Sequence, residues 1–190
     1  MMKKINKFYL GYFQYLKKLL DDKKNIKILD SIRKKILECK KKHGVVYIVG
    51  NGGSSSTANH ITVDLTKNAK INSQNFNESN LITCFANDFG YEKYIEKCIE
   101  FYCSKKDLII FLSCSGNSKN LINGAKFCKK NKINFITFTG REYKNSLRKI
   151  NTKGINLWVN SHAYNIIESV HFIYLASIVD SLIGKITYEP

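Results

Sequence analysis

The residues best suited to chemistry begin at position 50, where the run GNGGSSS follows a short apolar segment at 45–49. Glycines let a backbone turn tightly and approach a ligand closely. Ser54, Ser55 and Ser56 add hydroxyl groups at the start of an expected helix, where unpaired N–H groups and the helix dipole favour an anion. We therefore expect this turn to bind a phosphate group.

Two titratable residues follow on the expected helix. His60 and Asp64 are four residues apart, and this spacing places them on one helix face. An anion-binding turn and a titratable pair within fifteen residues suggest a site that joins binding to chemistry.

A second serine-rich turn, SCSGNS, occupies 113–118 after the expected strand at 107–113. A single turn of this kind is most often a helix cap. Two such turns at the ends of successive parallel strands, however, predict that hydroxyl and amide donors enclose one phosphate without a lysine. Cys114 offers its backbone N–H there.

The elements that must position these turns follow from hydrophobic periodicity. The pattern predicts two helices within 6–42 and strands at 45–49, 80–86, 107–113, 133–139 and 155–159. It predicts further helices at 55–68, 91–104, 119–131, 143–150 and 163–184. Continuous apolar strands that alternate with helices indicate an α/β fold, a three-layer αβα sandwich around a five-stranded parallel sheet. Ligands bind at the carboxyl ends of such strands, where both turns fall.

Length and composition limit the class of protein. With 190 residues, 44% of them hydrophobic, we expect one globular domain over 45–190 and an N-terminal helical oligomerisation segment over 1–44. The net charge of +16 is spread widely, and aromatic residues do not alternate with basic ones. This favours attraction for small anions over nucleic-acid binding.

Cysteine usage and hydropathy indicate a compartment. The six cysteines form no CxxC pair and no spacing typical of structural zinc, so we expect reduced thiols. We identify no secretory signal and no apolar stretch of roughly 18 residues. We therefore expect a cytoplasmic protein without a membrane partner.

Over nearly its whole length the chain resembles the SIS-domain (sugar isomerase) family, and within it the sedoheptulose-7-phosphate isomerases, or phosphoheptose isomerases. The motifs that carry the resemblance are GNGGS at 50–54, the helix with His60, ANDFG at 86–90, SCSGNS at 113–118, Thr139-Gly140 and ESVH at 168–171.

The resemblance implies conversion of a ketose 7-phosphate to an aldose 7-phosphate, a step towards the heptose of lipopolysaccharide or capsule. It also implies a homotetramer with active sites shared between subunits. Isomerisation needs a base that moves a proton between C1 and C2, and an acid or metal that polarises the oxygens. The implied substrate-binding residues are Asn51, Gly52, Gly53, Ser54, Ser55, Asp88, Ser113, Cys114, Ser115, Asn117 and Ser118.

The implied reaction centre departs from the family pattern. Family members hold zinc with a histidine, a glutamate, a glutamine and a second histidine, which fall here on His60, Asp64, Glu168 and Ala176. Asn165 replaces a further acidic residue.

We expect Asp64 or Glu168 to act as base, and His60 to orient the sugar or bind a metal. His60, Asp64 and Glu168 together could hold one zinc ion. For His162 and His171 we favour a solvated turn and a structural role, respectively.

The changed residues leave two alternatives open. One is a non-catalytic SIS protein that binds a phosphosugar or a protein partner. The other is an isomerase for a different sugar phosphate.

Overall fold

The central feature of the fold is a five-stranded parallel sheet with the strand order β2-β1-β3-β4-β5. The computed structural model describes residues 2–187, with side-chain surroundings for 5–187. The strands are β1 (Val46–Gly50), β2 (Ser73–Gln74), β3 (Leu108–Ser113), β4 (Asn134–Thr139) and β5 (Asn156–Trp158). The α/β sandwich predicted from the sequence is confirmed.

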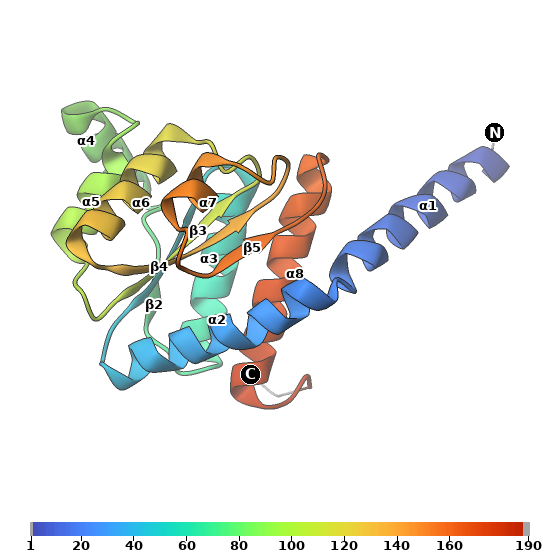
Figure 1. Cartoon of the computed structure of the whole chain (residues 1–190), viewed down its shortest axis with the longest axis horizontal. Helices are drawn as coiled ribbons and strands as arrows, with labels where there is room; N and C mark the ends of the chain where they lie inside the picture. The colour runs from blue at the N-terminus through green and yellow to red at the C-terminus, as the bar shows by residue number, and fades with distance from the viewer. Residues whose placement is uncertain (1, 188–190) are drawn as a thin grey trace.

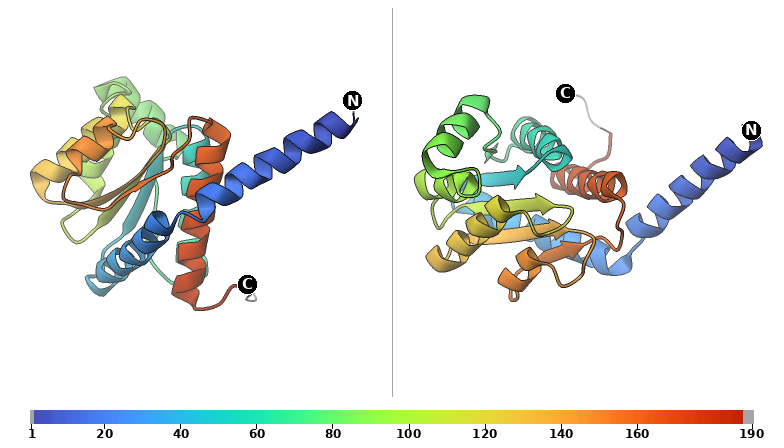
Figure 2. Two further views of the ribbon diagram at one scale, coloured as in Figure 1. Left: turned by 45° about the vertical axis from the view of Figure 1, so that its right-hand side comes forward. Right: turned by 90° about the horizontal axis from the view of Figure 1, so that it is seen from above.

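Helices cover both faces of the sheet (Figures 1 and 2). They are α1 (Met2–Leu20), α2 (Lys23–Lys41), α3 (Gly53–Lys67), α4 (Ser79–Phe89), α5 (Tyr94–Tyr102), α6 (Lys119–Asn131), α7 (Ser146–Ile150) and α8 (Tyr164–Ile183). Successive strand residues point to opposite faces. Thus Val46 and Ile48 pack with α2, α3 and α8, whereas Tyr47 and Val49 pack with α5 and α6.

The predicted strand at 80–86 is wrong, because these residues lie in α4. Glu78 caps this helix by accepting a hydrogen bond from the Leu81 N–H, and the Thr83 hydroxyl donates to the Ser79 carbonyl one turn earlier. A short apolar run fits a helix as well as a strand. The edge position in the sheet belongs to β2, which contributes only Ser73 and Gln74.

The N-terminal helices differ in their relation to the core. Ile32 and Ile36 of α2 are almost fully buried. Helix α1 instead projects from the body and leaves aromatic side chains such as Phe8 and Phe13 exposed (Figures 1 and 2). Its end is fixed by the Tyr174 hydroxyl of α8, which donates to the Leu19 and Leu20 carbonyls over 2.8 and 3.1 Å.

Helix α8 is long and apolar enough, by length and composition, to cross a membrane, with a mean hydropathy of 1.6 over 18 residues. No such segment was expected from the sequence. One side of α8 lies in the core through residues such as Ile167, Val170 and Val179, so it is apolar because it packs on the sheet, α2 and α3.

Candidate functional site

The two serine-rich turns meet at one pocket. Strands β1 and β3 are neighbours and run in parallel, so their carboxyl ends open at the same edge of the sheet. The pocket has a volume of about 200 Å³. It is lined by Asn51, Ser54, Leu112, Ser113, Cys114, Ser115, Ser118, Leu121, Tyr164 and Glu168.

The first turn depends on two glycines. Gly52 precedes α3 with φ +54° and ψ −126°, a backbone conformation that side-chain-bearing residues rarely adopt. A Cβ atom on Gly53 would overlap the Glu168 carboxylate. The Ser54 and Ser55 N–H groups bond the Asn51 and Gly52 carbonyls, so the Ser54 hydroxyl is the clearer ligand donor of this turn.

The second turn holds its hydroxyl groups ready to donate. Ser113 Oγ accepts from the Gly116 N–H and Ser115 Oγ accepts from the Asn117 N–H, each over 3.1 Å. Their O–H groups can therefore point at an anion. Ser118 occupies the N-cap of α6 but makes no side-chain cap bond within the described chain. We call Ser54, Ser113, Ser115 and Ser118 the serine cradle.

An amide pair joins the two turns. Asn51 Nδ2 donates to Asn120 Oδ1 over 3.0 Å, and Asn120 Nδ2 returns a bond to Asn51 Oδ1 over 2.8 Å. The Tyr91 hydroxyl also donates to Asn51 Oδ1. The turn after β1 and the first turn of α6 are thus fixed to each other, which sets the geometry of the cradle.

Glu168 lines the pocket beside the serine cradle, next to Cys114 and Gly53. Its Oε1 lies 3.7 Å from Cys114 Sγ. Burial, and secondly the Glu168 charge, raise the pKa of the Cys114 thiol to about 12, so the thiol stays protonated and donates to the carboxylate. Tyr164, one helical turn before Glu168, lines the same pocket.

His60 and Asp64 pair with each other, as their spacing predicts, with His60 Nε2 3.2 Å from Asp64 Oδ2. The His60 ring packs edge-on against Phe172, one turn beyond Glu168, and its side chain is 59% exposed. Asp64 Oδ1 also accepts from Asn68 Nδ2. Neither residue lines the pocket, so the structure does not bring this pair to the cradle.

The zinc implied by the family resemblance does not fit the donors of this chain. Ala176 provides no ligand, and it packs against the core. Over residues 5–187, no three His, Cys, Asp or Glu side chains gather closely enough to hold a metal ion. The predicted set of His60, Asp64 and Glu168 is therefore divided between a histidine–aspartate pair outside the pocket and the pocket wall.

Three other predicted binding residues have local roles. Asp88 lies on α4, where it accepts bonds from Asn87 and Cys84. Asn117 Oδ1 accepts from the Ser146 N–H, which fixes the second turn to α7. The Ser55 carbonyl accepts from Asn77, and none of the three lines the pocket.

Sequence reasoning missed three lining residues, the apolar Leu112 and Leu121 and the polar Tyr164. The spacing of four between Tyr164 and Glu168 could have identified Tyr164, since this spacing puts both residues on one face of α8. By contrast, the structural interpretation of His171 agrees with the structure. It is buried, with Nε2 3.3 Å from the Thr139 carbonyl, and burial lowers its pKa to about 4.

Comparison with known proteins gives consistent matches. A model of the SIS domain matches residues 11–140. The phosphoheptose isomerase of Histophilus somni is 32% identical over 132 residues, covering 67% of this chain and 68% of that protein. The phosphoheptose isomerase of Helicobacter pylori is 30% identical over 144 residues, covering 73% and 74%.

Solved structures share the fold. A phosphoheptose isomerase from Francisella tularensis superposes with a TM-score of 0.86 at 21% identity, covering 97% of this chain and 98% of that one. The phosphoheptose isomerase of Neisseria gonorrhoeae gives a TM-score of 0.85 at 19% identity, covering 95% and 98%.

Proposed function

Because this chain belongs to the SIS domain family, we propose that it is a phosphosugar isomerase that converts sedoheptulose 7-phosphate to D-glycero-D-manno-heptose 7-phosphate. Its product would supply the heptose of surface polysaccharides. The observation that carries the proposal is the convergence of two serine turns and one carboxylate on a single pocket. The names of the relatives support the choice of substrate.

The serine cradle binds the phosphate in this proposal. Its four hydroxyl groups donate hydrogen bonds, and the N-terminal ends of α3 and α6 add positive potential. Among the described residues that line the pocket, none carries a positive side chain. The chain's net charge of +16 attracts the anion over longer distances.

Glu168 is the base. Of the two carboxylates that the sequence left open, only Glu168 lines the pocket, whereas Asp64 is paired with His60 outside it. A carboxylate that removes a proton from C1 and returns it to C2 performs the isomerisation. His60 instead pairs with Asp64 and packs against Phe172, a contact between α3 and α8. We derive no step through a metal.

The test is turnover of sedoheptulose 7-phosphate by the purified protein, after chelation and with added zinc. We expect aldoheptose 7-phosphate to form. Ser113→Ala and Ser115→Ala should each raise KM about ten- to hundredfold, because each removes a hydrogen bond to a charged group. Ser181→Ala, at the far end of α8, is the matched control and should change nothing.

A second outcome would support another function. The family's second histidine is replaced by Ala176, which favours a non-catalytic SIS protein. Binding of sedoheptulose 7-phosphate without turnover in both metal arms would contradict the isomerase and support this binding protein. Turnover of another ketose phosphate alone would overturn the choice of substrate.

We further propose a cytoplasmic homotetramer assembled through α1. The exposed aromatic face of this projecting helix supports assembly, because large apolar patches mark contact surfaces. Light scattering should give the mass of four chains, and Phe8→Ser with Phe13→Ser should reduce it. An unchanged mass in the double variant would contradict this interface.

A further inference from the structure

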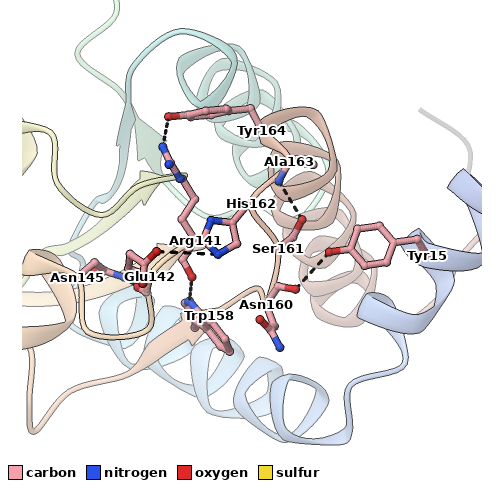
Figure 3. A network of polar contacts seen from close by, with 10 residues as sticks. All are labelled: Tyr15, Arg141, Glu142, Asn145, Trp158, Asn160, Ser161, His162, Ala163 and Tyr164. Carbon is pink, nitrogen blue, oxygen red and sulfur yellow. Dashed lines mark hydrogen bonds and ion pairs between the residues drawn. The ribbon is translucent and has the colours of Figure 1, made fainter.

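An arginine and a tyrosine form a pair at the rim of the pocket. Arg141 Nη1 donates to the Tyr164 hydroxyl oxygen over 2.6 Å, and the guanidinium lies 5.3 Å from the centre of the Tyr164 ring. Figure 3 shows the Arg141 side chain extending from its loop towards the hydroxyl at the start of α8. Two separate segments therefore combine at one edge of the pocket.

The backbone of Arg141 is fixed on both sides. Its N–H donates to the Ser161 carbonyl over 2.8 Å. Its carbonyl accepts from Trp158 Nε1 over 3.2 Å (Figure 3). Arg141 also has φ +50°, an uncommon value for a residue with a side chain. Such a conformation persists only where the surroundings impose it, and the two backbone hydrogen bonds fix the point from which the Arg141 side chain extends.

The pair leaves the Tyr164 proton available. Because the guanidinium only donates, Tyr164 acts as acceptor in this bond and its own O–H can donate elsewhere. The side chain is about half exposed and lines the pocket together with Glu168. A proton donor and a base thus lie one helical turn apart on one face of α8.

The other polar groups of the pocket are already engaged. The Asn51 amide is bonded to Asn120 and Tyr91, and the Cys114 thiol donates to Glu168. The serine cradle is assigned to the phosphate. Neither Ala176 nor His60 lines the pocket, so neither supplies a donor there, although isomerisation needs one for the sugar oxygens.

We propose that Tyr164 is the catalytic acid that serves the C1 and C2 oxygens of the substrate, and that Arg141 is its positioning residue. This inference rests on the proposed isomerase function. Glu168 takes a proton from C1, the C–H electrons form the C1=C2 bond, and the carbonyl electrons move to O2. Tyr164 gives its proton to O2, and Arg141 stabilises the resulting phenolate by its charge.

The second half of the reaction restores both residues. The phenolate of Tyr164 takes the proton of the O1 hydroxyl, and the O–H electrons form the C1=O1 bond. The electrons of the C1=C2 bond take the proton from Glu168 at C2. The aldose has formed, and both side chains regain their starting protonation.

The test uses Tyr164→Phe in the full chain with sedoheptulose 7-phosphate. We expect kcat to fall about hundredfold or more, the usual effect of losing a general acid, with KM changed less than about threefold. Inorganic phosphate should inhibit with an unchanged Ki, because the cradle is intact. Arg141→Gln should lower kcat about tenfold, and Arg141→Lys should recover part of that loss.

A second arginine–tyrosine pair nearby in the sequence offers a matched control. The Arg148 guanidinium, on α7, lies 4.2 Å from the centre of the Tyr143 ring, and neither residue lines the pocket. Tyr143→Phe and Arg148→Gln should leave kcat within about twofold.

The outcomes separate the two proposals. Unchanged kcat in Tyr164→Phe, with active unaltered protein, overturns the inference alone. A fall in kcat matched by a similar rise in phosphate Ki would show a structural role and also overturn it. If the unaltered protein has no turnover, the proposed function fails and the inference fails with it.

Discussion

Glu168→Gln tests two roles of this carboxylate, as the base of the reaction and as a negative charge in the pocket that binds phosphate. The substitution keeps the size and shape of the side chain and an acceptor for the Cys114 thiol, but it removes the negative charge. The close fit against Gly53 is also preserved, since an amide occupies the same volume as the carboxylate. The variant should therefore fold normally, and its effects should report on charge and proton transfer.

The substitution should weaken turnover but strengthen the binding of phosphate. Loss of a general base should lower kcat about 10²- to 10⁴-fold, which corresponds to about 3–5 kcal/mol in activation free energy. Loss of the charge that faces the bound phosphate should strengthen phosphate binding, because like charges in the pocket repel. At the effective dielectric of a partly solvated site this repulsion is on the order of 1 kcal/mol, or about fivefold in Kd.

The assay combines steady-state turnover of sedoheptulose 7-phosphate with calorimetric binding of inorganic phosphate. Glu142→Gln is the matched control. Its carboxylate lies on the loop after β4, 3.9 Å from His162, and is 72% exposed outside the pocket. Neither quantity should change in this control beyond about twofold.

Two results would refute the reasoning. If Glu168→Gln keeps more than about a tenth of the normal kcat, Glu168 is not the base. If it binds phosphate more weakly than the unaltered protein, the carboxylate holds the cradle in shape, and the argument from charge repulsion is wrong.

Three further predictions concern the scaffold. Burial puts the His171 pKa near 4 in the folded protein, against 6.5 in the unfolded chain, so the unfolded chain binds the proton first as the pH falls. The stability that a neutral His171 contributes is complete above pH 6.5, and about 3 kcal/mol of it is lost by pH 4. Urea unfolding should therefore show a free energy of unfolding that falls as the pH falls over this range. The same fall in His171→Gln would contradict the assignment of this pH dependence to His171. Gly52→Ala should lower the free energy of unfolding by about 2 kcal/mol, because alanine is strained at the positive φ of this position. An added Cβ would meet no atom within 4 Å, so backbone strain is the whole cost, and an unchanged melting temperature would refute it. Tyr174→Phe should cost about 1 kcal/mol and speed amide exchange at the end of α1, since both carbonyl contacts of its hydroxyl are lost; unchanged exchange at Leu19 and Leu20 would contradict that link.

The sequence predicted the sheet and the cradle because both depend on local chemistry. Continuous apolar runs such as 108–112 are long enough to identify buried strands, and the turns that follow them carry their ligand groups within a few residues. The run at 80–86 was assigned wrongly because none of its side chains is fully buried, and the Glu78 cap of its helix lies outside the run. Periodicity does not distinguish a helix from a strand in so short a run.

The reaction centre was harder to predict, because helix packing decides it. Spacing correctly paired His60 with Asp64, but it does not say which part of α8 their face meets. The structure places the His60 ring against Phe172, one turn past Glu168, and leaves Glu168 as the one member of the predicted catalytic set that lines the pocket. Tyr164 and Arg141 meet only because the loop after β4 and the start of α8 converge, although 23 residues separate them.

The most direct test of the central claim follows the proton itself. Sedoheptulose 7-phosphate would be incubated with the protein in D₂O, and the C1 and C2 positions observed by NMR. A base such as Glu168 that moves a proton between these carbons exchanges it with solvent, so the account predicts aldoheptose 7-phosphate that carries deuterium at C2. A ketose recovered without product and without deuterium at C1, in the presence of bound phosphosugar, would contradict it.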